Sequence, residues 1–264
     1  MGGGFIAIEL VSSFLKNNLK TTLLVREPYF FPRFLSPEEG HLAAEVLKKN
    51  GIEVILEDEI QALENSSKVE KVITKEGRTI NCQLLGVGVG IRPSLRFLDQ
   101  TPIRHDPFIE VDNNFQTNTE GVWAAGDVTF FPTPLLENKR INLQNWANAA
   151  DQGRLAGAAM TGSTQEGKLP LSMSYSINFF TSSISVIGVT NATLADLVIT
   201  RGSKEKGRLG RLFKKENKII GATLVGLPQD RVSIMKLLAK DIGTSYDENM
   251  SSLEFDLKEV TPVE

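Results

Sequence analysis

The sequence opens on a glycine-rich segment that could bind a dinucleotide. Gly2-Gly3-Gly4-Phe5-Ile6-Ala7 fits the pattern G-x-G-x-x-G/A at the start of a helix-like stretch. The first glycine, Gly2, would permit a tight turn, and Gly4 would let the backbone approach a pyrophosphate. Ala7 would let helix and strand pack closely. The pattern normally follows a strand, whereas only Met1 precedes it here. A glycine-rich start before any helix is therefore an equally open interpretation.

Two charged residues stand where the ribose of such a dinucleotide would meet the protein, roughly 20 residues further on. The segment there is Val25-Arg26-Glu27. Arg26 could pair with the 2′-phosphate of NADPH, and Glu27 could serve the ribose of NADH. Because Val25 cannot accept a hydrogen bond, the sequence predicts that NADPH binds at least as well as NADH. The other interpretation is that both charges are solvated at a strand end.

Two further segments place glycines after predicted apolar strands. Gly88 and Gly90 follow a strand predicted over 84–89, where they could let a ligand approach the backbone or could simply form a turn. Gly126-Asp127 follows a strand predicted over 122–125. Asp127 would accept hydrogen bonds from a polar, sugar-like chain, and Gly126 would leave room for that chain. The alternative is that Asp127 caps the next turn.

A helix predicted over 142–160 follows this element. Its N-terminal amides, near Asn145 and Trp146, could point at a ligand atom that develops negative charge. In the alternative, Asn142 caps the helix and Trp146 lies in the core.

Metal and thiol chemistry find little support in the sequence. His41 and His105 have no partners at ligand spacing, and we expect both at the surface. The lone cysteine, Cys82, excludes an internal disulfide and a CxxC pair, and we expect it to be a buried hydrophobe. We therefore predict no metal site.

Alternating helices and strands must position these segments. A helix is predicted over 5–19, and strands over 21–25 and 52–56. A second helix begins at Ser36, where Ser36 caps, Pro37 takes the first helical position and Glu39 completes a capping box. Strands at 69–74 and 78–85 form a predicted hairpin. This alternation indicates a parallel sheet covered by helices.

The pattern of apolar and polar residues changes near residue 170. Residues 172–179 alternate strictly between apolar and polar, which predicts a strand with one buried face. Further strands are predicted at 184–189, 197–200, 208–214 and 219–225, followed by a helix over 229–240. The sequence therefore predicts a second unit, an antiparallel sheet with a helix.

Composition sets the class of protein. The 264 residues are 41% hydrophobic and 23% charged, and the net charge is −3. This mixture is typical of a globular chain and gives no support to nucleic-acid binding. No targeting signal opens the sequence, and its longest uncharged stretch, 169–195, is rich in Ser, Thr and Asn and makes a poor membrane span. We expect a soluble, cytoplasmic protein.

Taken together, the segments resemble the FAD-dependent pyridine nucleotide-disulfide oxidoreductases. The resemblance is strongest to the branch with ferredoxin and rubredoxin reductases and apoptosis-inducing-factor-like proteins. The matching stretches occur in family order and cover nearly the whole chain: 2–9, 32–37, 88–93, 121–128, 145–162 and 219–226.

The resemblance implies an α/β fold in three parts. Residues 1–105 would form a Rossmann-like NAD(P)-binding domain that lacks its first strand. Residues 106–168 would be the C-terminal part of an FAD-binding domain, and residues 169–264 a C-terminal α+β domain of the dimerisation or interface kind. The FAD-binding βαβ unit that opens family members, with its own glycine motif, is absent from these residues.

The resemblance also implies roles for individual residues. Those for NAD(P)H are the pyrophosphate contacts Gly2, Gly4 and Ala7, the nicotinamide-ribose neighbour Glu9, and Gly88 and Gly90 beside the nicotinamide path. Those for FAD are Gly126 and Asp127 at the ribityl chain and Asn145, Trp146 and Ala147 near the isoalloxazine. No side chain is assigned to catalysis, because the redox chemistry belongs to the cofactors.

The activity implied is hydride transfer from NAD(P)H to FAD and then electron transfer to an acceptor such as a ferredoxin, a rubredoxin or a quinone-like partner. Because the FAD unit is missing, we expect a truncated or split form. Its partners would be an acceptor protein, a chain supplying the missing unit, or a second copy. Two alternatives stay open. The first is a non-catalytic nucleotide- or partner-binding module of the same fold. The second is a short-chain dehydrogenase, which is weakened because no Tyr-x-x-x-Lys pair occurs.

Overall fold

The computed structural model describes residues 1–64, 68–163, 173–240, 243–244 and 247–260. These residues form a mixed α/β structure, which confirms the predicted fold class. The chain divides into two compact units. The first comprises Met1–Gly90, Ser176–Val186 and Thr190–Glu264, and the second comprises Ile91–Tyr175 and Ile187–Val189. The division into three domains at 105 and 168 stays a prediction.

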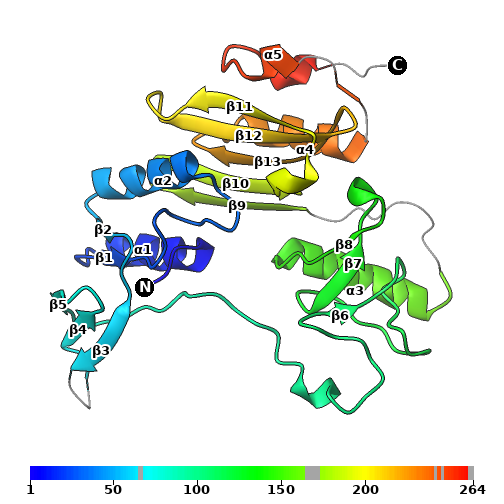
Figure 1. The fold of residues 1–264 in the computed structure, drawn as a ribbon, viewed down its shortest axis with the longest axis horizontal. Coiled ribbons are helices and arrows are strands. Elements are labelled where there is room, and N and C mark those ends of the chain that lie inside the picture. Colours follow the sequence, from blue (N-terminus) through cyan, green and yellow to red (C-terminus); the bar gives the residue numbers. More distant parts are fainter. Residues whose placement is uncertain (65–67, 164–172, 241–242, 245–246, 261–264) are drawn as a thin grey trace. The chain divides into compact units, whose positions relative to one another are not determined.

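The N-terminal part of the first unit alternates helices and strands as predicted (Figure 1). Strands β1 and β2 pair in parallel, with Leu23 opposite Val54. Strands β3, β4 and β5 form an antiparallel sheet in that order. Strand β3 was not predicted from the sequence. The bounds are α1 Phe5–Lys16, β1 Thr22–Leu24, α2 Pro37–Lys49, β2 Glu53–Ile55, β3 Ile60–Glu64, β4 Lys71–Thr74 and β5 Thr79–Asn81.

The capping box predicted for α2 is present. The Ser36 hydroxyl accepts a hydrogen bond from the Glu39 amide at 3.3 Å, and the Glu39 carboxylate accepts one from the Ser36 amide at 2.8 Å. Pro37 occupies the first turn, and Asn50 with Gly51, at φ +85°, ends the helix. These local contacts satisfy backbone donors that a helix leaves unpaired.

A five-stranded sheet forms the rest of the first unit, in the order β11-β12-β13-β10-β9. Helix α2 packs against β12 and β13, so the N-terminal part of the unit and this sheet share one body (Figure 1). Helix α4 packs against β13 and α5 against β11. The bounds are β9 Ser174–Phe179, β10 Ser182–Gly188, β11 Leu197–Ser203, β12 Arg208–Lys215, β13 Lys218–Val225, α4 Asp230–Lys240 and α5 Asp247–Met250.

A buried arginine holds the C-terminal segment to this sheet. Arg201 is 2% exposed, and its Nε donates to Asp230 at 2.7 Å. Its other nitrogens donate to the backbone carbonyls of Met250, Ser252 and Phe255. A charge so far from water is tolerated because all three nitrogens of the guanidinium donate to oxygens.

The second unit is built around one long helix. Helix α3 lies with the short strands β6, β7 and β8, of which β6 and β7 are parallel. An apolar core joins them, with Phe115 and Phe131 fully buried. The bounds are β6 Ile109–Glu110, β7 Thr129–Pro132, β8 Arg140–Ile141 and α3 Trp146–Met160.

Two predicted strands are wrong. Residues 83–90 adopt no strand, and Leu84 and Val89 are exposed. An apolar run becomes a strand only where neighbours complete its ladder, and here that help is limited to bonds with Met1. Residues 122–125 contain only an isolated bridge at Trp123, and the strand forms further on, at β7.

Among the residues that the structure describes, no helix is long and apolar enough to span a membrane.

Candidate functional site

The glycine-rich loop closes against two segments of the first unit. The Gly2 amide donates to the Leu24 carbonyl at 2.9 Å, and the Gly88 amide donates to the Met1 carbonyl at 2.8 Å. Gly2 has a φ of +131°, and a Cβ there would lie 2.2 Å from the Gly88 carbonyl oxygen. Only glycine fits this position, because the backbone is left-handed and a Cβ would collide with the Gly88 carbonyl group.

Helix α1 begins directly behind this loop without a cap of its own. Gly4 is its N-cap residue and provides no side-chain hydrogen bond, and the first turn carries no acidic residue. A helix N-terminus without a side-chain cap and without an acidic residue in its first turn is suited to an anion such as pyrophosphate. Ala7 is 2% exposed, as close packing at the third motif position requires, and Glu9 is exposed.

The side chains of Val25 and Phe31 lie close to Gly3 and Gly4, the other two glycines of the loop. A Cβ on Gly3 would lie 2.8 Å from Val25 Cγ1, and one on Gly4 would lie 3.5 Å from the Phe31 ring. The Phe31 ring also packs edge-on against Phe5, with 4.5 Å between centroids. The loop is therefore held tightly on this side, and sequence reasoning did not identify Phe31.

Arg26 and Glu27 lie beside the same loop and pair with each other. The Arg26 guanidinium donates to Glu27 Oε1 at 2.8 Å, with side chains 67% and 30% exposed. Glu27 Oε2 comes within 3.7 Å of the position that a Gly3 Cβ would take. A 2′-phosphate approaching Arg26 would meet this carboxylate, which opposes a second negative charge. The ion pair between Arg26 and Glu27 therefore favours binding of a free ribose hydroxyl over binding of a 2′-phosphate.

Gly88 joins this group, while Gly90 stands apart from it. A Cβ on Gly88 would meet the Ala7 amide at 3.2 Å, which places Gly88 over the start of α1. Gly90 has a φ of +105° and open space around it. In the first unit the structure thus brings together Gly2, Gly4, Ala7, Glu27 and Gly88.

A second group of predicted residues lies in the other unit, around Gly126 and Asp127. Gly126 has a φ of +91°, and its amide donates to Gln152 Oε1 of α3 at 2.7 Å. Burial raises the pKa of Asp127 above its ordinary value. Its carboxylate accepts no hydrogen bond from any residue that the structure describes, so the alternative of a turn cap finds no support.

Three amide side chains on or just before α3 each leave one buried atom without a hydrogen-bond partner, and two of them bond to this segment. The atoms are Oδ1 of Asn142, Oδ1 of Asn148 and Nε2 of Gln152. The opposite end of each amide is well bonded. Asn142 Nδ2, for example, donates to the carbonyls of Asp127 and Thr129 at 2.9 and 2.8 Å. Unpaired buried amides are costly, so this cluster has spare capacity for polar groups of a ligand.

The predicted start of the long helix needs a correction. Asn145, not Asn142, is its N-cap residue, and its Oδ1 accepts from the Asn148 amide at 2.8 Å. Trp146 takes the first helical position with 86% of its surface exposed, so the interpretation of Trp146 as a core residue is wrong. Ala147 is half-buried beside it.

Gln152 and Asn142 are functional candidates that sequence reasoning missed. Gln152 is fully buried in α3 and holds both the Gly126 amide and the Thr129 hydroxyl, each at 2.7 Å. The available signal was a glutamine inside a helix of small apolar residues, WANAADQGRLAGAAM. Only the fold shows that this glutamine reaches Gly126.

The histidines and the cysteine form no metal centre within the part of the chain that is described. His41 is exposed, as expected. The expectation for His105 is wrong, because it is half-buried and partnered. Its Nδ1 meets the Ile103 carbonyl and its Nε2 meets Asp99, and these hydrogen bonds raise its pKa. Cys82 is half-buried rather than buried.

Curated relatives with a similar sequence include apoptosis-inducing factor 3 of Homo sapiens, 27% identical over 223 residues. This alignment covers 83% of this chain and 36% of the relative. Rhodocoxin reductase of Rhodococcus erythropolis is 26% identical over 260 residues, covering 98% of this chain and 59% of the relative. Monodehydroascorbate reductase of Pisum sativum is 26% identical, with coverage of 95% and 60%. The chain thus spans between about a third and three fifths of these relatives.

Solved structures share the fold. The chain matches the covalent putidaredoxin reductase–putidaredoxin complex with a TM-score of 0.85 and 19% identity, covering 98% of this chain and 61% of the matched one. It matches a ferredoxin reductase from Rhodopseudomonas palustris with a TM-score of 0.83 and 23% identity, covering 98% and 63%. The family model described as pyridine nucleotide-disulphide oxidoreductase matches residues 1–153. The chain therefore belongs to the pyridine nucleotide-disulphide oxidoreductase family.

Proposed function

We propose that this chain is the nucleotide-binding part of an FAD-dependent NAD(P)H oxidoreductase. The observation that carries the proposal is the uncapped N-terminus of α1 behind the Gly2 loop, a site suited to the pyrophosphate of a nicotinamide nucleotide. Family membership supports the same class of reaction. Two of the similar proteins, rhodocoxin reductase and monodehydroascorbate reductase, are reductases by name.

The residues of the second unit fit the middle of a flavin. The Asp127 carboxylate would accept hydrogen bonds from ribityl hydroxyls, and Gly126 leaves room beside it. The unpaired amide atoms of Asn142, Asn148 and Gln152 supply further polar capacity. Bound FAD would supply the two-electron chemistry that no protein side chain provides. Trp146, exposed at the start of α3, would exclude water near the ring.

The proposal includes partners for this chain. An electron-transfer protein would accept the electrons, as one matched structure is a complex of a reductase with putidaredoxin. A further polypeptide segment would bind the adenosine pyrophosphate of FAD, because the N-terminus of α3 is already capped by the Asn145 side chain. The proposal also includes a second copy of this chain as a partner, in a homodimer. We place the protein in the cytoplasm, in keeping with its single cysteine.

Purification of the 264 residues with and without added FAD tests the proposal. We expect NADH to bind in an equilibrium titration, FAD to bind weakly, and NAD(P)H oxidation with an artificial acceptor to be slow. A stoichiometric yellow protein with steady turnover would show that these residues alone bind the flavin pyrophosphate. Failure to bind either nucleotide would contradict the proposal.

Asp127 should matter for flavin and not for folding. Asp127→Ala should cost about 1–3 kcal/mol of FAD affinity, because ribityl donors lose their acceptor. Isothermal titration with FAD measures this loss. In the flavin-free chain the melting temperature should hardly change. A large drop there would instead indicate a structural role for the carboxylate.

The raised pKa of Asp127 also predicts a pH effect on the flavin-free chain. Because the folded-state pKa lies above the unfolded one, the carboxyl lowers stability as pH rises from the unfolded pKa through the folded pKa. Asp127→Asn should therefore be slightly more stable than the parent chain at neutral pH. The two should be equally stable at a pH below the unfolded pKa. Denaturant titrations at the two pH values compare them, and an Asn variant that is less stable at neutral pH would contradict the prediction.

Glu27 and Arg26 should differ in their effect on nucleotide binding. We expect NADH to bind more tightly than NADPH, in place of the preference predicted from sequence, because Glu27 occupies the loop side of the pair. Glu27→Gln should weaken NADH by about tenfold or more, the value of a charged hydrogen bond. The matched variant Arg26→Gln should leave NADH binding within about twofold. A strong loss of NADPH binding in Arg26→Gln would restore Arg26 as a phosphate ligand.

A further inference from the structure

The segment between β1 and α2 carries a strained residue, Phe31, beside the glycine-rich loop. Phe31 has a φ of +58°, in the left-handed region that residues with a side chain rarely adopt. Its ring lies 3.5 Å from the position that a Gly4 Cβ would take, and its amide nitrogen lies 3.8 Å from that of a Gly3 Cβ. Backbone and ring of this one residue therefore form a wall of the loop that would bind pyrophosphate.

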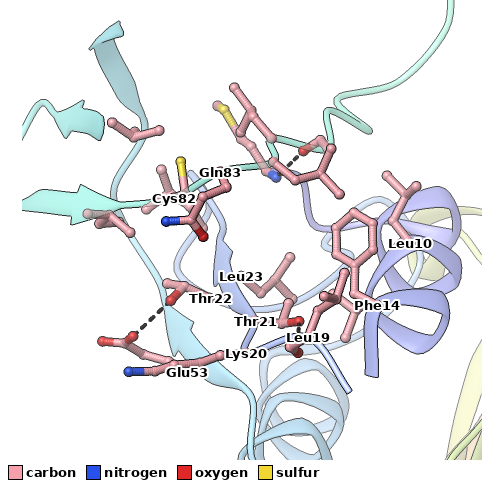
Figure 2. Close-up of a pocket in the computed structure, with 18 of the residues that line it drawn as sticks. Leu10, Phe14, Leu19, Lys20, Thr21, Thr22, Leu23, Glu53, Cys82 and Gln83 are labelled. Carbon is pink, nitrogen blue, oxygen red and sulfur yellow. Dashed lines mark hydrogen bonds between the residues drawn. The ribbon is translucent and has the colours of Figure 1, made fainter. Parts of the chain in front are cut away.

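Phe31 contacts α1 on one side of that helix. The centroids of the Phe31 and Phe5 rings are 4.5 Å apart. Figure 2 shows Leu10 and Phe14 pointing from α1 towards a groove beside β1. Because an α-helix has about 3.6 residues per turn, Phe5 faces away from Phe14. The Phe31 ring therefore reaches the start of α1 from the side away from this groove.

A left-handed residue with a side chain persists only where its surroundings hold it in place. The Phe31 carbonyl accepts hydrogen bonds from the amides of Phe34 and Leu35 at 3.1 and 3.0 Å, which closes a turn over residues 31–35. Helix α2 lies directly on the backbone before this turn, since a Cβ on Gly40 would be 2.5 Å from the Phe30 carbonyl oxygen. The turn is therefore fixed at its first residue.

Arg211 of β12 holds the other end of the turn. Its Nη2 donates to the Phe34 carbonyl and its Nε donates to Glu39 Oε2, each at 2.8 Å. The same carboxylate oxygen accepts from the Ser36 amide at 2.8 Å. The guanidinium can bridge the turn and the start of α2 because its donors stand on separate nitrogens in a rigid plane. Its side chain is only 18% exposed, so these bonds are largely shielded from water.

We propose that Arg211 is a positioning residue for the nucleotide site. It holds the turn at 31–35 from the C-terminal sheet, and the turn holds Phe31 against Gly3 and Gly4. Because the loop is then ordered before pyrophosphate arrives, less conformational freedom is lost on binding. The inference rests on the proposed binding of a nucleotide at this loop. It adds that nucleotide affinity depends on a strand that does not itself touch the nucleotide.

Arg211→Lys tests this inference in the purified 264-residue chain. Lysine keeps the positive charge beside Glu39 but has a single nitrogen, so it cannot also hold the Phe34 carbonyl at the guanidinium's spacing. We expect the dissociation constant for NADH to rise about fivefold, the value of one hydrogen bond. Calorimetric titration measures this change at a temperature where circular dichroism shows the variant folded.

Hydrogen exchange in the nucleotide-free chain gives a second readout. The Ile8 amide donates to the Gly4 carbonyl at 3.2 Å and reports on the order of the loop and the start of α1. Its exchange should be about fivefold faster in Arg211→Lys than in the parent chain. Unchanged exchange would overturn the inference. A parent chain that binds no NADH would instead contradict the proposed function, while exchange would still test the role of Arg211.

A double-mutant cycle separates positioning through Phe31 from a general loss of stability. In a Phe31→Ala background, Arg211→Lys should change the NADH dissociation constant and the Ile8 exchange rate by less than about twofold, because the residue through which Arg211 acts is gone. The same fivefold effects in both backgrounds would overturn the inference, since additive effects mean that the two residues act independently.

Two further residues give matched controls. The Thr223 hydroxyl donates to Glu39 Oε1 at 2.6 Å, so Thr223→Val removes a buried bond but no contact of Arg211. It should lower stability and leave NADH affinity and Ile8 exchange within about twofold of the parent chain. Arg208→Lys, at an exposed position of the same strand, should change none of the three. Equal losses of NADH affinity in Thr223→Val and Arg211→Lys would overturn the inference in favour of a merely structural role.

Discussion

Gly2→Ala should destabilise the chain by about 3 kcal/mol or more, because two costs add at this residue. The backbone has a φ of +131°, which strains any residue with a side chain, and the new Cβ would lie 2.2 Å from the Gly88 carbonyl oxygen. Relief would require the loop and residues 86–88 to separate, which breaks the bonds around Met1. Nucleotide affinity should fall with stability. Urea denaturation and an NADH titration measure the two effects.

Gly51→Ala is the control for Gly2→Ala. Gly51 has a φ of +85° but open space where a Cβ would go, so alanine there meets only the backbone strain. The expected loss is about 1 kcal/mol, with NADH binding unchanged. Equal losses for the two variants would show that the contact between Gly2 and Gly88 is not what makes glycine necessary.

Glu39→Ala should cost about 3–5 kcal/mol, the range for breaking a buried ion pair. Glu39 is fully buried, and its carboxylate meets Arg211 Nε at 2.8 Å and the Thr223 hydroxyl at 2.6 Å, besides the Ser36 amide. Its removal leaves the Arg211 guanidinium, itself only 18% exposed, without its carboxylate. Chemical denaturation of the two proteins compares their free energies of unfolding.

Glu38→Ala is the matched control, one residue earlier in the same helical turn and exposed. It should change stability by less than about 0.5 kcal/mol. If Glu39→Ala lost only about 1 kcal/mol while Glu38→Ala lost almost nothing, Glu39 would act through its helix cap alone. The link from α2 to β12 and β13 would then carry little energy.

Local features of this protein could be predicted from its sequence, since they depend on atoms a few residues apart. The capping box from Ser36 to Glu39 and the end of α2 at Gly51 are set by side-chain and backbone contacts within four residues. The strict alternation that predicts β9 and the apolar stripes of α1 and α2 are local in the same sense. The order of the motifs was sufficient to indicate the family, which the family model confirms.

Tertiary structure decided whatever depends on a distant partner. The sequence identifies Glu39 only as part of a helix cap. Its bonds to Arg211 and Thr223 join residues that are more than 170 positions apart in the chain. Gln152 reaches Gly126 only because α3 folds back on that turn. The apolar run at 84–89 reads as a strand, yet it forms none, since a ladder needs a neighbour along its whole length. The apolar pattern of a segment shows its tendency to form a strand. Whether the strand forms is decided by the backbone partners that the fold brings beside it.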